Sequence, residues 1–133
     1  IAPGNTRLVG MKTTATGRKP HKEAIVAKSF WQTFGESLDD KEFIEETFRQ
    51  AVEAAKATLL HIHLHRFSGG GGVSGVAVLA ESHISIHTWP ERGFAAVDIF
   101  MCGDAMPLKA VEVMRAAFRP RHTSVAEHKR GIV

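Results

Sequence analysis

Hydrophobic and polar residues alternate over several short segments of the chain, and this alternation predicts strands. In residues 59–67, Leu60, Ile62 and Leu64 share one face and three histidines share the other, which is the pattern of a half-buried strand. Residues 82–89, SHISIHTW, alternate in the same way. Further apolar segments of strand length are 24–31, 73–80, 94–102 and 122–128.

Two other segments have the spacing of an amphipathic helix. The first follows the cap-type sequence SLDD and runs from about Asp39 to Lys56. Its apolar stripe consists of Phe43, Ile44, Phe48, Ala51, Val52 and Ala55. Asp104 and Pro107 are typical of the start of a second helix. The apolar stripe that follows them consists of Leu108, Val111, Met114 and Phe118.

The predicted order of elements is β-α-β-β-β-β-α-β. Because the turns between the central strands are short, we expect these strands to pair antiparallel. Two amphipathic helices can cover one face of such a sheet, so the predicted fold is an α/β (α+β) two-layer sandwich with a mainly antiparallel sheet. A chain of 133 residues suffices for a single domain, 1–133. Residues 1–22 lack periodicity and are expected to form a flexible extension.

Composition and charge exclude several classes of protein. The formal charge is +3, with basic residues between 7 and 28 and near the C-terminal end, and a nucleic-acid protein usually shows a stronger basic stripe. No apolar run approaches the roughly 20 residues that a membrane span needs. The N-terminal segment lacks the apolar centre of a signal peptide. Cys102 is the only cysteine, so we expect no intramolecular disulfide and a cytoplasmic protein.

The three alternating histidines raise the possibility of a metal site. His61, His63 and His65 point the same way on one strand, a geometry that metal sites use. No carboxylate or cysteine is interleaved to complete the ligand set, so the row is equally explained as a solvent-facing or subunit-facing surface. We expect no metal, and keep a non-catalytic metal-binding module as an alternative. The glycines at 69–72 are interpreted as a hairpin loop.

The segment LAESHISIHTWPE carries an unusual concentration of polar residues between two apolar strands. Glu81, Ser82, His83, Ser85 and His87 all fall within it. A serine beside a histidine suggests nucleophile chemistry. A hydrolase elbow is disfavoured because G-x-S-x-G is absent and a strand, not a helix, follows. Cys102 fits either a small buried apolar residue or a proton donor, since a thiol is mostly protonated at neutral pH.

Residues 79–103, LAESHISIHTWPERGFAAVDIFMCG, resemble the self-processing segment of the bacterial and archaeal S-adenosylmethionine decarboxylases. The resemblance extends back through HRF and GVSGV (65–67 and 72–76) and forward to VAEHKRG (125–131). It covers most of residues 60–131. Residues 24–58 match only in pattern, as a strand followed by a helix.

This resemblance implies that the chain is a proenzyme that cuts itself between Glu81 and Ser82, giving chains 1–81 and 82–133. The Ser82 hydroxyl would attack the Glu81 carbonyl and form an ester. Elimination and hydrolysis would then leave a pyruvoyl group, derived from Ser82, at the new N-terminus. By the same analogy His87 is the base for processing, and Ser74 assists by hydrogen bonding to the ester or oxyanion intermediate.

For turnover, the resemblance implies a Schiff base between the pyruvoyl group and the substrate amine, with loss of CO2 for spermidine biosynthesis. Cys102 would then protonate the α-carbon. Phe67 and Trp89 would stack on the adenine, and Glu91 would accept hydrogen bonds from the ribose. The expected assembly is a homodimer of processed protomers.

Two features of the sequence qualify this assignment. Ser82 and His87 are an odd number of residues apart, so a regular strand places them on opposite faces, and the resemblance therefore requires a bend or bulge at or just after Ser82. Lys28, Gly69 to Gly71, Arg92 and Phe94 depart from the residues expected in the family. They leave an arginine or ornithine decarboxylase of the same fold as the alternative, and a degenerate homologue that only binds or regulates as another.

Overall fold

The computed structural model describes residues 23–31 and 35–128, with residues 23–31, 35 and 36 described by their backbone alone. The extension predicted for residues 1–22 lies outside the described residues, as does the side chain of Lys28. The strands agree with their predicted bounds to within one residue, and the long first helix is two residues shorter at each end. The elements are β1 (Glu23–Trp31), α1 (Gly35–Leu38), α2 (Lys41–Ala54), β2 (Leu59–Arg66), β3 (Val73–Leu79), β4 (Ser82–Trp89), β5 (Phe94–Met101), α3 (Pro107–Phe118) and β6 (His122–His128), with 3-10 turns η3 (Ser68–Gly70) and η4 (Pro90–Arg92).

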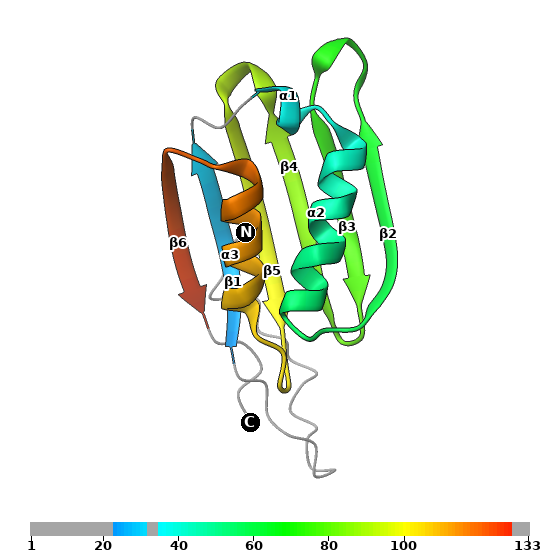
Figure 1. Cartoon of the computed structure of the whole chain (residues 1–133), viewed down its shortest axis with the longest axis vertical. Coiled ribbons are helices and arrows are strands. Elements are labelled where there is room, and N and C mark those ends of the chain that lie inside the picture. The colour runs from blue at the N-terminus through cyan, green and yellow to red at the C-terminus, as the bar shows by residue number, and fades with distance from the viewer. Residues whose placement is uncertain (1–22, 32–34, 129–133) are drawn as a thin grey trace.

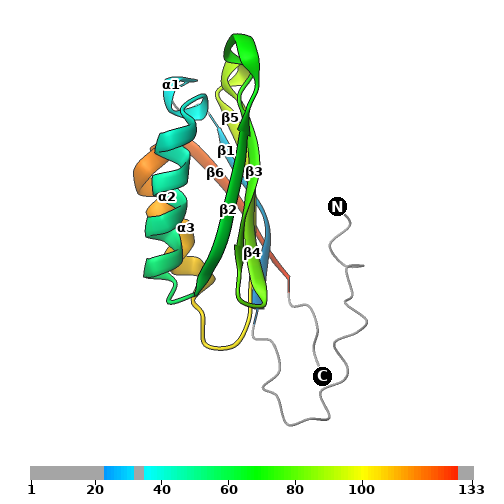
Figure 2. The same ribbon diagram turned by 90° about the vertical axis from the view of Figure 1, so that its right-hand side faces the viewer.

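The six strands form one sheet in the order β2-β3-β4-β5-β1-β6, and every neighbouring pair is antiparallel. The consecutive strands β2 to β5 form a meander, as their short turns predict. β1 lies between β5 and β6, far from its neighbours in the sequence. Both long helices lie on one side of the sheet (Figures 1 and 2). The predicted two-layer sandwich is therefore confirmed.

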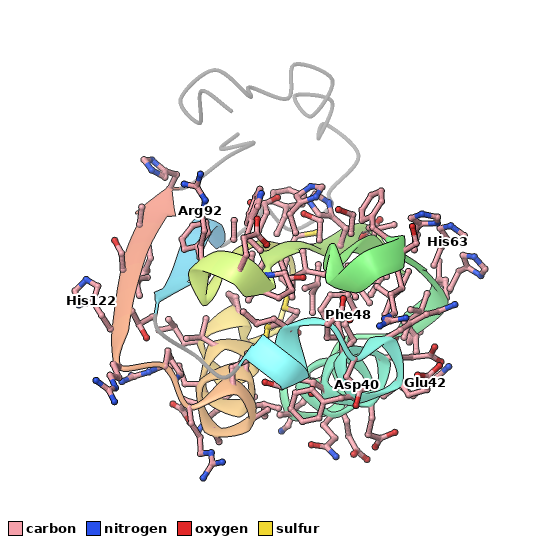
Figure 3. All side chains as sticks on the ribbon, turned by 90° about the horizontal axis from the view of Figure 1, so that it is seen from above. Asp40, Glu42, Phe48, His63, Arg92 and His122 are labelled. Atoms are coloured by element: carbon pink, nitrogen blue, oxygen red, sulfur yellow. The ribbon has the colours of Figure 1, made fainter. Side chains whose placement is uncertain are left out.

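The core lies between the sheet and the two long helices. Ile84 and Ile86 of β4 are fully buried and point toward the helices. They belong to the same buried cluster as Phe48 of α2 and Phe118 of α3, and Figure 3 shows Phe48 in the layer between α2 and the sheet. Removing one such side chain from water contributes about 1.5–3 kcal/mol to stability.

Local sequence signals set the ends of the helices. The Asp40 side chain accepts a hydrogen bond from the Phe43 backbone N–H at 3.0 Å, which caps the start of α2. Pro107 opens α3, where its fixed φ suits the first turn. Within the described part of the chain, no helix combines the length and the apolar character needed to cross a bilayer.

Within the part of the chain that the structure describes, no helix lies over the opposite face of the sheet (Figure 2). Along β4, the buried residues Ile84, Ile86 and Thr88 alternate with residues of this second face. The register of the ladders places side chains from the four strands of the meander there in rows. They are His61, His63, His65, Ser74, Val76, Val78, His83, Ser85, His87, Trp89, Phe94, Ala96, Asp98 and Phe100, and are referred to below as the open face.

Candidate active site

The junction between Glu81 and Ser82 lies at the end of a tight hairpin. Leu79 pairs with Ser82, so that only Ala80 and Glu81 connect β3 to β4. Glu81 has φ of 61°, in the left-handed region. That region normally suits glycine, and an L side chain there costs about 1–2 kcal/mol. The peptide bond expected to break therefore follows a residue with a strained backbone.

Cys102 is brought to this junction by the end of β5. Its thiol donates a hydrogen bond to the Glu81 carbonyl oxygen at 3.0 Å. The Ser82 hydroxyl oxygen lies 3.7 Å from the same sulfur atom. The structure thus brings together three residues named from the sequence, with the Ser82 hydroxyl and the Cys102 thiol beside the peptide bond that is expected to break. We refer to Glu81, Ser82 and Cys102 as the cleavage group.

Ser74 and His87 form a second group. A 2.8 Å hydrogen bond joins the Ser74 hydroxyl to His87 Nδ1, and the two residues face each other across the β3–β4 ladder. The pair lies on the open face. A hydroxyl held by an imidazole can relay or accept a proton, which is the chemistry expected of a processing base.

The cleavage group and the Ser74–His87 pair are not together in one chain. β4 pairs with β3 from Ser82 to His87 without a register shift, so the expected bend or bulge after Ser82 is wrong. Five residues of regular strand separate Ser82 from His87 by about 17 Å, on opposite faces. The odd sequence spacing of Ser82 and His87 therefore predicts their opposite faces correctly, because no bulge interrupts the β3–β4 ladder.

The residues named for substrate binding lie at the Ser74–His87 end of the sheet. Phe67 follows β2, with its ring centroid 4.6 Å from that of His65 in an edge-to-face contact. Trp89 ends β4, its ring 6.3 Å from His87 and 5.3 Å from Phe94. Glu91 is exposed in η4, directly after it. Both aromatic side chains keep a large exposed fraction, 45% for Phe67 and 38% for Trp89. Their faces are thus available to a flat ligand.

One contact on the open face involves a residue that the sequence analysis did not single out. His83 Nε2 lies 2.8 Å from Asp98 Oδ2 on the neighbouring strand, and the His83 ring lies 5.7 Å from the Phe100 ring. Asp98 is the only charged residue within the apolar strand 94–101. A single charged residue in an otherwise apolar strand is the sequence signal that could have indicated a polar partner on the neighbouring strand.

The histidine row of β2 does not gather into a ligand set. His61, His63 and His65 lie opposite Val78, Val76 and Ser74. Figure 3 shows His63 at the β2 edge of the molecule. Among residues 35–128, no three side chains of the metal-binding types converge. The metal-binding alternative therefore gains no support from the geometry.

Comparison with known proteins identifies the family of this chain. The family model described as S-adenosylmethionine decarboxylase matches residues 25–131. The chain belongs to this family. Relatives named S-adenosylmethionine decarboxylase proenzyme include one from Methanococcus vannielii, 47% identical over 104 residues, which are 77% of this chain and 84% of the relative.

Another relative with the same name, from Thermomicrobium roseum, is 44% identical over 99 residues, covering 74% of this chain and 85% of its own. Among solved structures, the adenosylmethionine decarboxylase from Aquifex aeolicus superposes with a TM-score of 0.77 at 31% identity. That match covers 86% of this chain and 95% of the other. The resemblance seen in residues 60–131 is thereby confirmed and extended over the first strand and helix of this family member.

Proposed function

We propose that this chain is a proenzyme that cuts itself between Glu81 and Ser82 and then decarboxylates S-adenosylmethionine. The observation that carries the proposal is the cleavage group, in which the Cys102 thiol donates to the carbonyl of a strained Glu81 and also lies 3.7 Å from the hydroxyl of the next residue, Ser82. The printed names of its relatives favour this substrate over arginine or ornithine. The product would serve spermidine synthesis, and the lone free cysteine fits the cytoplasm.

Self-cleavage would use protein groups alone, with no added cofactor. The Ser82 oxygen attacks the Glu81 carbonyl carbon, the C–N bond breaks, and the acyl group moves to the serine as an ester. The Cys102 S–H stabilises the oxyanion on the carbonyl oxygen that it already contacts. A base then removes the Ser82 α-proton, which expels the Glu81 carboxylate and leaves dehydroalanine. Addition of water releases ammonia and leaves a pyruvoyl group on residue 82.

The residues around Ser82 fit such a group. The Cys102 sulfur lies 3.7 Å from the Ser82 hydroxyl oxygen, so a pyruvoyl group formed on residue 82 would lie close to the thiol. The pyruvoyl group supplies a carbonyl that reacts with the substrate amine and accepts the electrons left when CO2 departs. Cys102 holds the proton that the α-carbon needs afterwards, since a thiol is mostly protonated at neutral pH. The same side chain thus serves processing and turnover in succession.

A single chain does not hold all the parts of this site. Ser82 lies at one end of β4, and the other proposed site residues lie at the opposite end. These are the proposed base His87 and the proposed adenine and ribose contacts Phe67, Trp89 and Glu91. The seven residues from Ser82 to Trp89 span about 23 Å of strand. This length separates the reacting amine from the proposed adenine contacts too widely for one chain to serve both. The complete site therefore needs a second copy.

We propose a homodimer of processed protomers that pack through their open faces. A two-fold axis perpendicular to the strands would place the His87 end of one sheet over the β3–β4 turn of the other, and would do so twice. Ser82 belongs to the helical side of its own sheet, so the partner would reach the cleavage group at this turn, where Glu81 is exposed and Ser82 and Cys102 are half-buried. The open face suits an interface because no element among the described residues covers it and because it exposes Val78 and Trp89. Each active site would then combine the cleavage group of one protomer with Ser74, His87, Phe67 and Trp89 of its partner.

Denaturing mass spectrometry of the purified full-length chain tests the proposal directly. We expect two fragments, 1–81 and 82–133, with the second blocked at its N-terminus. Labelled S-adenosylmethionine should release CO2, while arginine and ornithine should not. The Ser82→Ala variant, which lacks the nucleophile, should stay intact and inactive. An intact wild-type chain with no CO2 release after long incubation would contradict the proposal, and a preference for arginine would overturn the substrate.

A further inference from the structure

The loop between β2 and β3 is held at its base by one residue of the helical layer. Asp39 lies between α1 and α2. Its Oδ1 accepts a hydrogen bond from the Gly72 backbone N–H at 2.9 Å, and its Oδ2 forms an ion pair with Arg66 Nη2. Arg66 Nε also donates to the Asp39 carbonyl oxygen at 2.8 Å. Asp39 therefore holds both the last residue of β2 and the residue that precedes β3.

The tip of this loop contributes little to its own rigidity. Gly69 and Gly70 have φ of 69° and 74°, and a Cβ added at either would meet no heavy atom within 4 Å. Glycines in open space have the greatest conformational freedom of any residue. A backbone hydrogen bond from Phe67 N–H to the Gly72 carbonyl, at 2.8 Å, closes the loop at its root. The placement of Phe67 therefore depends on the base of the loop.

Leu38, the residue before Asp39, connects the helical layer to β3 and β4 through the side chain of Thr88. The Thr88 hydroxyl donates to the Leu38 carbonyl oxygen at 2.6 Å and accepts from the Val73 N–H at 2.8 Å. Thr88 is 5% exposed and directly precedes Trp89. Leu38 and Asp39 thus join the helical layer to the two strand ends from which Phe67 and Trp89 project.

We infer that Asp39 is a positioning residue for substrate binding, which fixes the base of the 67–72 loop through Arg66 and Gly72 and so orients Phe67 toward the adenine ring. The inference rests on the proposed function, because it needs Phe67 to contact the nucleoside. Asp39 lies in the helical layer and touches no reacting group. Its loss should therefore weaken substrate binding without changing cleavage or the chemical step.

The test is the Asp39→Asn variant of the full-length chain, which keeps the shape of the side chain and removes the charge that Arg66 pairs with. We expect the KM for S-adenosylmethionine to rise roughly 3- to 30-fold, the range for residues that act through a packed element. The kcat and the extent of self-cleavage should stay within about twofold of wild type, since the loss of binding that is equal in the ground state and the transition state raises KM and leaves kcat unchanged. Amide exchange at Gly72 should become faster, while exchange at Ser82 and Cys102 should not change.

The neighbouring Asp40→Asn variant is the matched control. It removes the same charge from the same end of α2, but asparagine keeps the N-cap hydrogen bond to Phe43. Its KM should equal that of wild type. A folded Asp39→Asn enzyme with the wild-type KM would overturn the inference, as would a loss confined to kcat or to cleavage.

Arg66→Gln breaks the same ion pair from the other side and keeps the inference testable if Asp39→Asn fails to fold. It should raise the KM by a similar factor, and the double variant should be no worse than either single one, because the two residues act through one contact. An Arg66→Gln enzyme with an unchanged KM would contradict the inference. Failure of the proposed function looks different: the wild-type chain itself would neither cleave nor release CO2.

Discussion

The thiol of Cys102 donates a hydrogen bond to the carbonyl oxygen of Glu81, 3.0 Å away, in the uncleaved chain. This contact precedes any catalytic turnover, because the carbonyl belongs to the bond that must break first. It connects the end of β5 to the β3–β4 turn, two parts of the chain that are 21 residues apart. The proton donor expected for decarboxylation is therefore already positioned for self-cleavage.

Replacing Cys102 with alanine should slow self-cleavage as well as turnover. We expect the cleavage rate to fall roughly 10- to 100-fold, less than the loss of a stronger N–H donor to an oxyanion usually causes. Time-resolved denaturing gels of freshly purified chain would measure it. Serine at position 102 retains a hydroxyl donor and should recover part of the cleavage rate. A Cys102→Ala chain that cleaves at the wild-type rate would show that the hydrogen bond has no role in processing.

Glycine at position 81 should relieve the strain in the turn. In a Ser82→Ala background, which prevents cleavage, Glu81→Gly should raise the free energy of unfolding by about 1 kcal/mol, the cost that an L residue bears in the left-handed region. Urea unfolding of the two intact chains would measure the difference. Glu81→Val at the same position should destabilise the chain instead. Equal stability of all three chains would mean that the φ of Glu81 stores no strain.

Two inactive chains should complement each other if the site is shared between protomers. A Ser82→Ala chain keeps His87, and a His87→Ala chain keeps Ser82. In a mixed dimer one site holds both intact residues, so up to about half of the His87→Ala copies should cleave when the two chains are co-expressed. Fragment masses distinguish the two chains. No cleavage in the mixture, with both variants folded, would place Ser82 and His87 in the same protomer and exclude the composite site.

The stabilising effect of Asp39 should depend on pH in one direction. The hydrogen bond from Arg66, followed by the one from the Gly72 backbone, holds the pKa of Asp39 below the ordinary value of 3.8, although partial burial opposes this. A carboxyl whose pKa is lowered by folding stabilises the native state above its unfolded pKa, and this contribution is lost as the pH falls through the folded value. The other charged groups beside Asp39 and Arg66 are those that line the same surface pocket of about 420 Å³, namely Asp40, Lys41 and Glu42.

The unfolding free energies of wild type and Asp39→Asn should therefore differ most above about pH 5 and converge at pH values well below 3.8. Chemical denaturation at a series of pH values measures this difference, and the Asp40→Asn chain serves as the control for general charge effects. A difference that grows as the pH falls would have the wrong sign and would reject this assignment.

Much of the fold could be predicted because it depends on local pattern. The alternation in residues 61–66 and 82–89 gives the faces of β2 and β4, and the short turns give the meander. The prediction that Leu60 shares the apolar face of β2 is wrong, because a register shift between Leu59 and His61 leaves Leu60 63% exposed. The position of β1 between β5 and β6 could not be predicted, since it depends on pairing between segments far apart in the sequence. The φ of Glu81 was likewise hidden, because a two-residue hairpin with glutamate in the left-handed region has no composition signal.

The sequence proposes the candidate site residues one by one, and the structure shows which of them lie together. The parity of Ser82 and His87 indicates opposite faces, and the regular ladder of β4 confirms this simple geometric result. The expectation of a bulge arose from requiring both residues in one protomer. Sequence spacing within a chain carries no information about which groups a second copy contributes.

The place of β1 in the sheet determines how the two fragments of the proposed cleavage would be held together. β1 belongs to the N-terminal fragment, yet it is hydrogen-bonded on both edges to β5 and β6 of the C-terminal fragment. β3 and β4 form a further ladder across the break, and α2 packs on α3. The two pieces are thus interleaved, and neither has a continuous sheet of its own. Cleavage should therefore leave one folded molecule with two new chain ends. The two fragments should separate only when the whole molecule is denatured.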